Sequence, residues 1–232
     1  MALSISAWLA VLALSLPPSQ TVTPIRVLVV TGGHTYPTSF YSVFEQPGLT
    51  WDHAVSSEEA YRADLRDRYD VLVLHDMPKT LSDTGRQHLR AFAEAGKGLV
   101  VVHHAIVSYP DWDWYRDLIG GRYLEQPRDG QPASSYRHDE QMRIVIARPH
   151  PVTEGLAPFS VRDEIYKGMW LAPTNTVLLT TDNPTGDPAV AWVSAYPRSR
   201  VVTIQLGHGP ETHRDPSFRR LVLNAITWSA SR

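Results

Sequence analysis

The sequence has no cysteine and no excess of either charge, and each absence excludes whole classes of function. Without a thiol there can be no disulfide, thiolate zinc site, CxxC redox centre or cysteine nucleophile. The 22 Lys and Arg residues nearly balance the 24 Asp and Glu residues, giving a net charge of -2. Such a balance lacks the basic footprint of proteins that bind nucleic acid or anionic membranes, so we expect no nucleic-acid partner. No GxGxxG or GxxxxGK(S/T) string occurs either, which excludes nucleotide binding through those motifs.

Apolar runs long enough to span a bilayer are also missing. Residues Ala7 to Leu16 (AWLAVLALSL) form an apolar run that ends at Pro17-Pro18. That length suits the central region of a signal peptide and is too short for a transmembrane helix, although no Lys or Arg precedes it. We expect residues 1–22 to be a signal peptide or a disordered tail, and the protein to be exported to the periplasm or the cell exterior; the alternative is a cytoplasmic protein. Residues 23–232 then form one domain, and a homo-oligomer is compatible with the sequence.

Four short apolar runs predict strands that are buried on both faces of a parallel sheet. They are Ile25 to Val30, Val71 to Leu74, Leu99 to Val102 and Val201 to Leu206. Helical patterns follow or separate them. We expect one helix from an N-cap at Ser82 to about Ala95, a short one capped by Asp111 and closed by Gly120-Gly121, and a final one after Asp215-Pro216.

The third quarter of the chain is rich in strand-like segments, namely residues 142–147, 176–181 and 189–195. They either extend the sheet or form an antiparallel edge. The polar segment from Tyr123 to Tyr136 predicts an exposed loop. Together these patterns predict a doubly wound α/β fold with a mostly parallel sheet and an added strand-rich insert.

Histidines cluster where the predicted strands end. His34 follows the first run after Gly32-Gly33, His75 follows the second, His103-His104 follow the third, and His208 lies between two glycines after the last. In an open parallel sheet, ligands bind outside the carboxyl ends of the strands. Adjacent residues at a strand end point to opposite faces, so only one of His103 and His104 is required to reach a pocket. The neighbouring glycines, Gly33 and Gly207, allow close approach of the backbone to a ligand.

Other segments offer further candidates, each with a plainer alternative. Glu164 and Tyr166 follow a predicted turn, and a carboxylate near imidazoles can act as a general base or orient a histidine ligand; the alternative is a solvated acidic edge. His138 can reach the rim from the end of the long loop. Trp112 can stack on a sugar, whereas for Trp114 we favour packing in the core.

Several short strings, in this order, resemble the ThuA-like (trehalose utilisation) family. They include LVVTGGH (28–34), GKGLVVVHH (96–104), WYRDLIGG (114–121), HPVTEGL (150–156), DEIY (163–166) and LGH (206–208). The resemblance implies a flavodoxin-like fold of the class I glutamine amidotransferase type. It also places His103 on the turn where true amidotransferases carry a catalytic cysteine, so thioester chemistry on glutamine is excluded here.

The resemblance implies a carbohydrate partner: a disaccharide, glycoside or keto-sugar. The family positions carried by this sequence are His34, His103, His138, Glu164 and His208. We expect His103, His104, Glu164 and His138 to be catalytic, and His34 and His208 to bind one divalent metal ion. The expected substrate-binding residues are Gly33, Tyr36, Trp112, Tyr166 and Gly207.

The chemistry stays open between a metal-assisted reaction and acid–base catalysis by His and Glu, which leaves a hydrolase, a lyase and an isomerase as candidate classes. The alternative to an enzyme is a non-catalytic, exported sugar-binding or accessory module.

Overall fold

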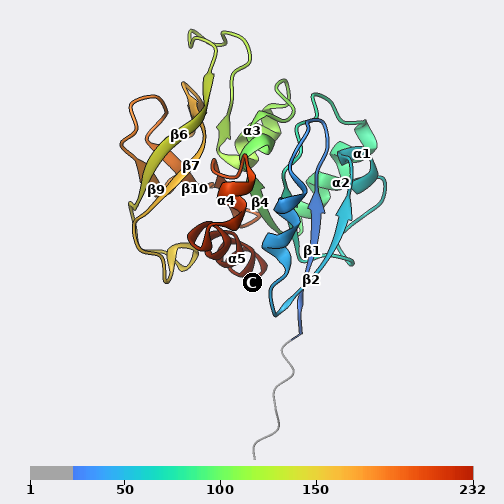
Figure 1. Cartoon of the computed structure of the whole chain (residues 1–232). Coiled ribbons are helices and arrows are strands. Elements are labelled where there is room, and N and C mark those ends of the chain that lie inside the picture. The colour runs from blue at the N-terminus through green and yellow to red at the C-terminus, as the bar shows by residue number, and fades with distance from the viewer. Residues whose placement is uncertain (1–22, 232) are drawn as a thin grey trace, which may run out of the picture.

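A computed structural model describes residues 23–231, and the signal-peptide prediction for residues 1–22 lies outside the described residues. The described chain forms one nine-stranded sheet in the order β2-β1-β3-β4-β11-β10-β9-β6-β7, and a small second sheet of β5 and β8. Figure 1 shows β1 and β2 on one side of the molecule and β6, β7 and β9 on the other. The strands are β1 (Ile25–Val30), β2 (Leu49–Ala54), β3 (Val71–Leu74), β4 (Gly98–Val102), β5 (Gly121–Arg122), β6 (Ser135–Ile146), β7 (Phe159–Lys167), β8 (Trp170–Leu171), β9 (Thr176–Thr181), β10 (Ala189–Val193) and β11 (Val201–Ile204).

Half of the sheet is parallel, and the sequence predicted most of it. The four apolar runs became β1, β3, β4 and β11, which pair in parallel with one another along this order. All residues of β3, β4 and β11 are buried. The sequence analysis missed β2, which pairs in parallel with β1 at the edge of the sheet. Its alternating half-buried and exposed residues give no continuous apolar run.

Helices cover both faces of the sheet, as a doubly wound fold requires. Successive strand residues point to opposite faces: Leu28 and Val30 join one hydrophobic cluster, and Val27 and Val29 join the other. The first cluster contains residues of α1, α2 and α3, and the second contains residues of η1, η3 and α5. The helices are α1 (Ser57–Ala60), α2 (Asp83–Glu94), α3 (Asp113–Ile119), α4 (Pro210–Arg214) and α5 (Pro216–Ala230), with the 3-10 helices η1 (Thr38–Phe44), η2 (His103–Val107) and η3 (Pro151–Thr153).

Two of the three predicted helix starts are confirmed. The Ser82 side chain accepts a hydrogen bond from the Gly85 amide, and Asp215 accepts from the first amides of α5. The predicted cap at Asp111 is wrong, because α3 begins at Asp113 and its N-cap is Trp112, whose side chain forms no capping bond. The helix does end at Gly120, which adopts the left-handed conformation (φ 69°). No described helix is long and apolar enough to cross a membrane.

The other half of the sheet is antiparallel. The three strand-like segments extend the sheet as β6, β9 and β10, and β10 pairs with β11. One prediction here is wrong: residues 163–166 do not follow a turn but lie inside β7, which pairs with β6. Similarly, β6 begins at Ser135, so His138 is on a strand and not on a loop. This hairpin carries three of the candidate residues, His138, Glu164 and Tyr166, to the edge where the parallel strands end.

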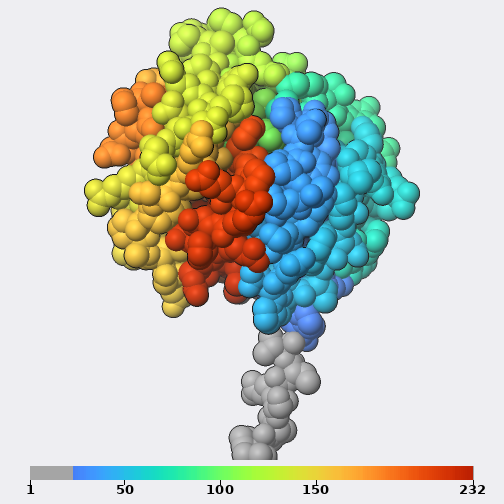
Figure 2. All heavy atoms as spheres, viewed as in Figure 1, coloured from blue at the N-terminus to red at the C-terminus, as the bar shows by residue number. Residues whose placement is uncertain are grey.

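The C-terminal helices join the two halves. Helix α4 contacts η1 on one side and β7 on the other. Figure 2 shows the same order at the surface, with the red C-terminal segment between the blue N-terminal segment and the yellow segment of the antiparallel half.

Candidate functional site

A cavity of about 330 Å³ lies where the two halves of the sheet meet. Its lining comes from the loops after β1, β3, β4 and β11, from the loop between β5 and β6, and from the hairpin of β6 and β7. The lining residues are His34, Met77, His104, Val107, Tyr123, Glu125, Ser134, Tyr136, His138, Glu164, Tyr166 and His208. We call this the histidine cavity. Imidazoles from segments far apart in the sequence therefore share one concave surface, as the strand-end pattern predicted.

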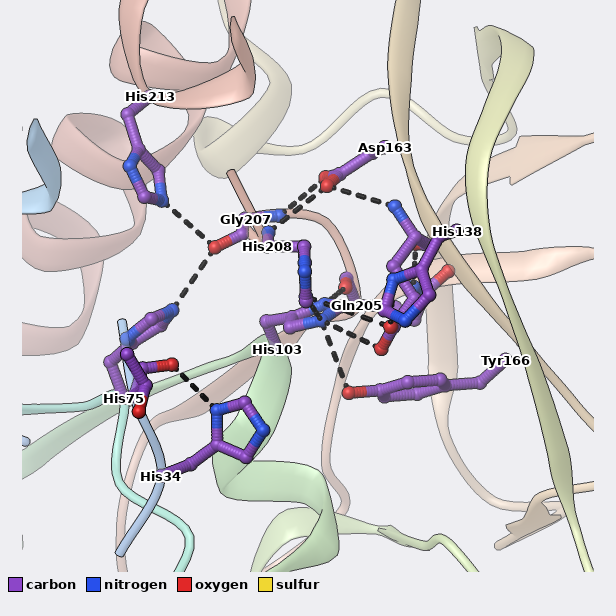
Figure 3. Close-up of polar contacts among 12 residues, drawn as sticks. His34, His75, His103, His138, Asp163, Tyr166, Gln205, Gly207, His208 and His213 are labelled. Atoms are coloured by element: carbon purple, nitrogen blue, oxygen red, sulfur yellow. Dashed lines mark hydrogen bonds and ion pairs between the residues drawn. The ribbon is translucent and has the colours of Figure 1, made fainter. Parts of the chain in front are cut away.

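His103 lies directly behind the cavity wall and is fully buried. It follows β4 with a φ of 48°, a left-handed conformation that costs energy for a residue with a side chain. The sharp turn expected from the amidotransferase resemblance is thus present. The Nδ1 atom hydrogen-bonds to the carbonyl oxygen of Gln205, and Nε2 lies 3.2 Å from each of Glu164 Oε1, His208 Nδ1 and the Tyr166 hydroxyl (Figure 3).

Glu164 is the only carboxylate among the described residues that contacts these imidazoles in the cavity. Its Oε2 lies 2.7 Å from His138 Nδ1 and 3.6 Å from His208 Nδ1. Burial by itself raises the pKa of Glu164, but the hydrogen bond with His103 and the surrounding imidazoles outweigh it, so the pKa is lowered overall. Glu164 is therefore an ionised, buried carboxylate held between three histidines.

Both members of the His103-His104 pair belong to the site, and each has a different place. His104 lines the cavity, with its ring centroid 4.3 Å from that of His34 and 5.3 Å from that of His208. Burial, then the neighbouring imidazoles, lower the pKa of His104 well below its usual range. Burial also lowers the pKa of His208. Both rings are therefore neutral at physiological pH, with a lone pair free for a ligand or a hydrogen-bond donor.

Asp163 fixes the loop that carries His208, and the sequence analysis gave it no such role. Its Oδ1 accepts from the amides of Glu164 and His208, both at 3.0 Å, and its Oδ2 accepts from the amide of Gly207 at 2.7 Å. These bonds join the centre of β7 to the loop after β11. One buried carboxylate thereby sets the position of Glu164 relative to His208.

Gly207 shapes this loop and does not line the cavity. Its φ of 122° is accessible mainly to glycine, and its carbonyl oxygen accepts hydrogen bonds from His75 Nε2 at 3.0 Å and His213 Nε2 at 2.9 Å. His75 and His213 are therefore buried supports of the loop.

The other predicted residues divide between the cavity and its surroundings. His34, His138 and Tyr166 line the cavity. Gly33 does not; it packs against the backbone of Met77, where a Cβ atom would lie 2.5 Å from a carbonyl carbon. Tyr36 also lies outside the lining, and its hydroxyl hydrogen-bonds to Thr31 and Tyr41.

Trp112 is placed differently from the prediction. It is 6% exposed, belongs to the core cluster and packs edge-on against Tyr109, whereas Trp114 is only partly buried. The prediction was the reverse, and the structure differs because the chain between η2 and α3 folds Trp112 inward. The aromatic residues that do line the cavity are Tyr123, Tyr136 and Tyr166. The first two are the end residues of the segment 123–136, which the sequence predicted as an exposed loop.

Four residues place potential metal-ligating atoms close together. One such atom from each of His103, His104, Glu164 and His208 lies within 4.8 Å of the others. Of the two histidines predicted as metal ligands, His208 belongs to this group, and His34 lies beside it against His104.

Solved structures show where this fold occurs. A thua-like protein from Parabacteroides merdae ATCC 43184 is 20% identical, with a TM-score of 0.78 over 90% of this chain and 91% of that one. A thua-like protein from Bacteroides uniformis ATCC 8492 is 19% identical, with a TM-score of 0.70 over 93% and 95% of the two chains. These likenesses establish the fold, including the expected flavodoxin-like, amidotransferase-like sheet.

A cold-adapted β-galactosidase from Rahnella sp. R3 contains the same fold in 31% of its chain, which aligns with 89% of this one at 14% identity and a TM-score of 0.61. No curated protein sequence matches the chain. The family model described as "Trehalose utilisation" matches residues 26–229. The chain therefore belongs to the ThuA family.

Proposed function

We propose that the protein is a carbohydrate-processing enzyme in which His103, Glu164 and His208 bind one divalent cation at the wall of the histidine cavity. The family supports a role connected with carbohydrates. The observation that carries the proposal is the close approach of His103 Nε2, Glu164 Oε1 and His208 Nδ1. No hydrogen is assigned between His103 Nε2 and Glu164 Oε1.

The hydrogen bonds of His103 fix its tautomer. A carbonyl oxygen can only accept, so Nδ1, which contacts the Gln205 carbonyl, carries a proton. In the neutral ring, Nε2 then presents a lone pair toward Glu164 Oε1, 3.2 Å away. Two lone pairs facing each other in a buried site repel unless a positive charge lies between them. A metal cation or a proton supplies that charge, and the Tyr166 hydroxyl, 3.2 Å from Nε2, can donate a weaker neutral hydrogen bond there.

The distances suit a cation with three protein ligands. In a tetrahedral zinc site with bonds of about 2.0–2.2 Å, neighbouring ligand atoms lie about 3.3–3.6 Å apart. The separation from His103 Nε2 is 3.2 Å to both Glu164 Oε1 and His208 Nδ1, and Glu164 Oε2 lies 3.6 Å from His208 Nδ1. The bond from His103 Nδ1 to a backbone carbonyl is the usual support of a metal-binding histidine.

A bound divalent cation would supply Lewis-acid polarisation of a sugar carbonyl or of water. The chain's own residues do the rest. His138 pairs with Glu164 and is 54% exposed in its side chain, so it can pass a proton between the cavity and solvent. Neutral His104 and the Tyr166 hydroxyl can hydrogen-bond to a sugar, and Tyr123 and Tyr136 offer ring faces for it.

The second candidate is acid–base catalysis without a metal, favoured by the 2.7 Å contact between His138 and Glu164. Here a proton would lie between His103 and Glu164, and His138, held by Glu164 through Nδ1, would remove a proton beside a sugar carbonyl with its free Nε2 and return it elsewhere. That reaction is an elimination or an isomerisation.

Elemental analysis of the purified protein and calorimetric titration with Zn²⁺ and Mn²⁺ test the proposal. We expect about one cation per chain, lost in the His103→Ala and His208→Ala variants and retained in His88→Ala. His88 is a suitable control because it lies on α2 and bonds to the Tyr61 carbonyl, away from the cavity. Absence of binding by the unaltered protein would remove the metal proposal.

A turnover screen against plain and oxidised disaccharides, with and without these cations, separates the remaining alternatives. Turnover that needs the cation supports the proposal, and turnover without it supports acid–base catalysis. Sugar binding without any turnover would identify the protein as an accessory binding module.

A further inference from the structure

A groove beside the histidine cavity contains a buried arginine that the proposed chemistry does not use. Two cavities of about 380 and 250 Å³ both border on Arg122, Leu124 and Arg128. We call them together the arginine groove. The larger one shares Tyr123 and Glu125 with the histidine cavity. The histidine cavity and the arginine groove therefore share part of one wall.

Arg122 has an unmet hydrogen-bonding capacity. The residue is 5% exposed, and its Nη1 donates to Asp113 Oδ1 at 2.9 Å. Its buried Nη2 has no hydrogen-bond partner among residues 23–231. Buried donors in folded proteins nearly always have an acceptor. Burial, its largest influence, lowers the pKa of Arg122, so its charge is held at a cost that an additional acceptor would offset.

The charges around Arg122 favour an anion as that acceptor. The smaller cavity is lined by Arg116, Arg122 and Arg128, and its one lining carboxylate, Asp129, has a side chain that is 86% exposed. Asp113 Oδ1 contacts all three guanidinium groups at distances of 2.9, 3.5 and 3.5 Å; Arg116 also pairs with Asp117 at 2.7 Å and Arg128 with Asp111 at 3.5 Å, whereas Arg122 has Asp113 as its one ion-pair partner among the described residues.

The larger cavity adds two carboxylates that compete little for Arg122. Asp111 has a side chain that is 95% exposed, and Glu125 is paired with Lys79 at 2.5 Å. Exposed carboxylates are well hydrated and compensate a buried cation weakly. The groove therefore keeps more positive charge at its buried wall than at its mouth.

We propose that the arginine groove binds an oxyanion, a carboxylate or a phosphate ester, carried by the carbohydrate that occupies the histidine cavity. The inference rests on the proposed function for the carbohydrate and on Arg122 for the anionic group. A guanidinium group matches the planar, two-oxygen geometry of a carboxylate or phosphate. The preferred substrates are then sugar acids or sugar phosphates and not neutral sugars.

Calorimetric titration of the full chain with glucuronate, glucose 6-phosphate and glucose tests this inference. We expect at least one of the two anionic sugars to bind about tenfold or more tightly than glucose, with the preference falling as salt is added. The comparison of glucuronate with glucose 6-phosphate tells a carboxylate from a phosphate.

The Arg122→Met variant should bind all three sugars equally. The control is Arg90→Met, since Arg90 lies over the rings of Trp112 and Trp114 and outside the groove; it should keep the preference.

Because Arg122 is buried, Arg128→Gln provides a second variant with a partly exposed side chain; it should reduce the preference by about threefold or more. Equal affinity of the unaltered protein for glucose and both anionic sugars would overturn the inference, as would the same loss in Arg90→Met. The His103→Ala variant separates the two proposals. If His103→Ala loses cation binding and keeps the preference for anionic sugars, both proposals are supported. If the unaltered protein binds the cation but prefers neutral sugars, only the proposal for the arginine groove is contradicted.

Discussion

The parallel and antiparallel halves of the sheet contribute different chemistry to one cavity. The parallel half supplies His34, His104 and His208 from loops at its strand ends, with His103 behind them. The antiparallel half supplies the carboxylate of Glu164, its partner His138 and the phenol of Tyr166. Imidazoles alone offer neutral ligands, and the carboxylate gives the cluster its negative charge. The strand-rich insert therefore completes the site, because it contributes side chains that the parallel half lacks.

Four predictions test this division of roles, beginning with the largest expected free-energy change. In the parallel half, Trp112→Ala should lower the free energy of unfolding by about 3–5 kcal/mol, because it removes a large buried ring from the core. Denaturant unfolding measures the loss. The partly buried Trp114 provides the control, and Trp114→Ala should cost clearly less. If Trp112→Ala weakened sugar binding while stability stayed unchanged, Trp112 would have the sugar-stacking role that the sequence suggested.

In the antiparallel half, Glu164→Gln should reduce cation affinity by about 100-fold or more, since it removes the only carboxylate of the cluster and keeps its shape. Calorimetric titration with Zn²⁺ gives the affinity. Glu140→Gln, a half-buried carboxylate on the neighbouring β6, should leave the affinity within about twofold of the original value. An unchanged affinity in Glu164→Gln would show that the insert does not supply the charge.

The junction between the halves is tested by Asp163→Asn. An amide would direct N–H groups toward backbone amides that now donate to Asp163, so the loop of His208 should shift and cation affinity should fall about 10- to 100-fold. Asp187→Asn is the matched control, because Asp187 also accepts from two backbone amides but lies outside the cavity. Equal losses of cation affinity in both variants would mean that Asp163 acts through general stability alone.

The last prediction concerns Asp76, at the carboxyl end of β3 in the parallel half. Burial raises the pKa of Asp76 to about 7, so the folded state holds this proton more tightly than the unfolded state. Its contribution to stability is therefore complete below the ordinary pKa of about 3.9 and is lost as the pH rises to about 7.

Asp76→Asn should remove that decline, and its stability relative to the unaltered protein should increase between pH 5 and pH 8. Denaturant unfolding at the two pH values measures the difference, with the exposed Glu94→Gln variant as the control. A difference that does not change with pH would show that Asp76 is ionised in the folded state at pH 5.

Sequence patterns predicted most strands of both halves and missed one in each, β2 and β7, for a physical reason. Strands such as β4 are buried on both faces and appear as continuous β-branched runs, and glycine and Asp-Pro signals mark where helices end or begin. The residues of β7 alternate less clearly, because its buried section includes Asp163 and Glu164, whose polar groups are satisfied by partners distant in sequence. A local pattern cannot show that such a carboxylate is buried.

By itself, the sequence determined the fold class and the placement of histidines after strands, and it excluded thiol chemistry, because these depend on local composition and periodicity. Only the tertiary structure decided that His103 meets Glu164 across 61 positions, that His104 faces the cavity, that Asp163 joins the two halves, and that Trp112 is in the core. Those contacts depend on strand order, which brings together residues whose proximity no local sequence pattern indicates. The same holds for Arg122 Nη2, which has no partner in the part of the chain that the structure describes, because a missing partner is visible only when the neighbours are in place.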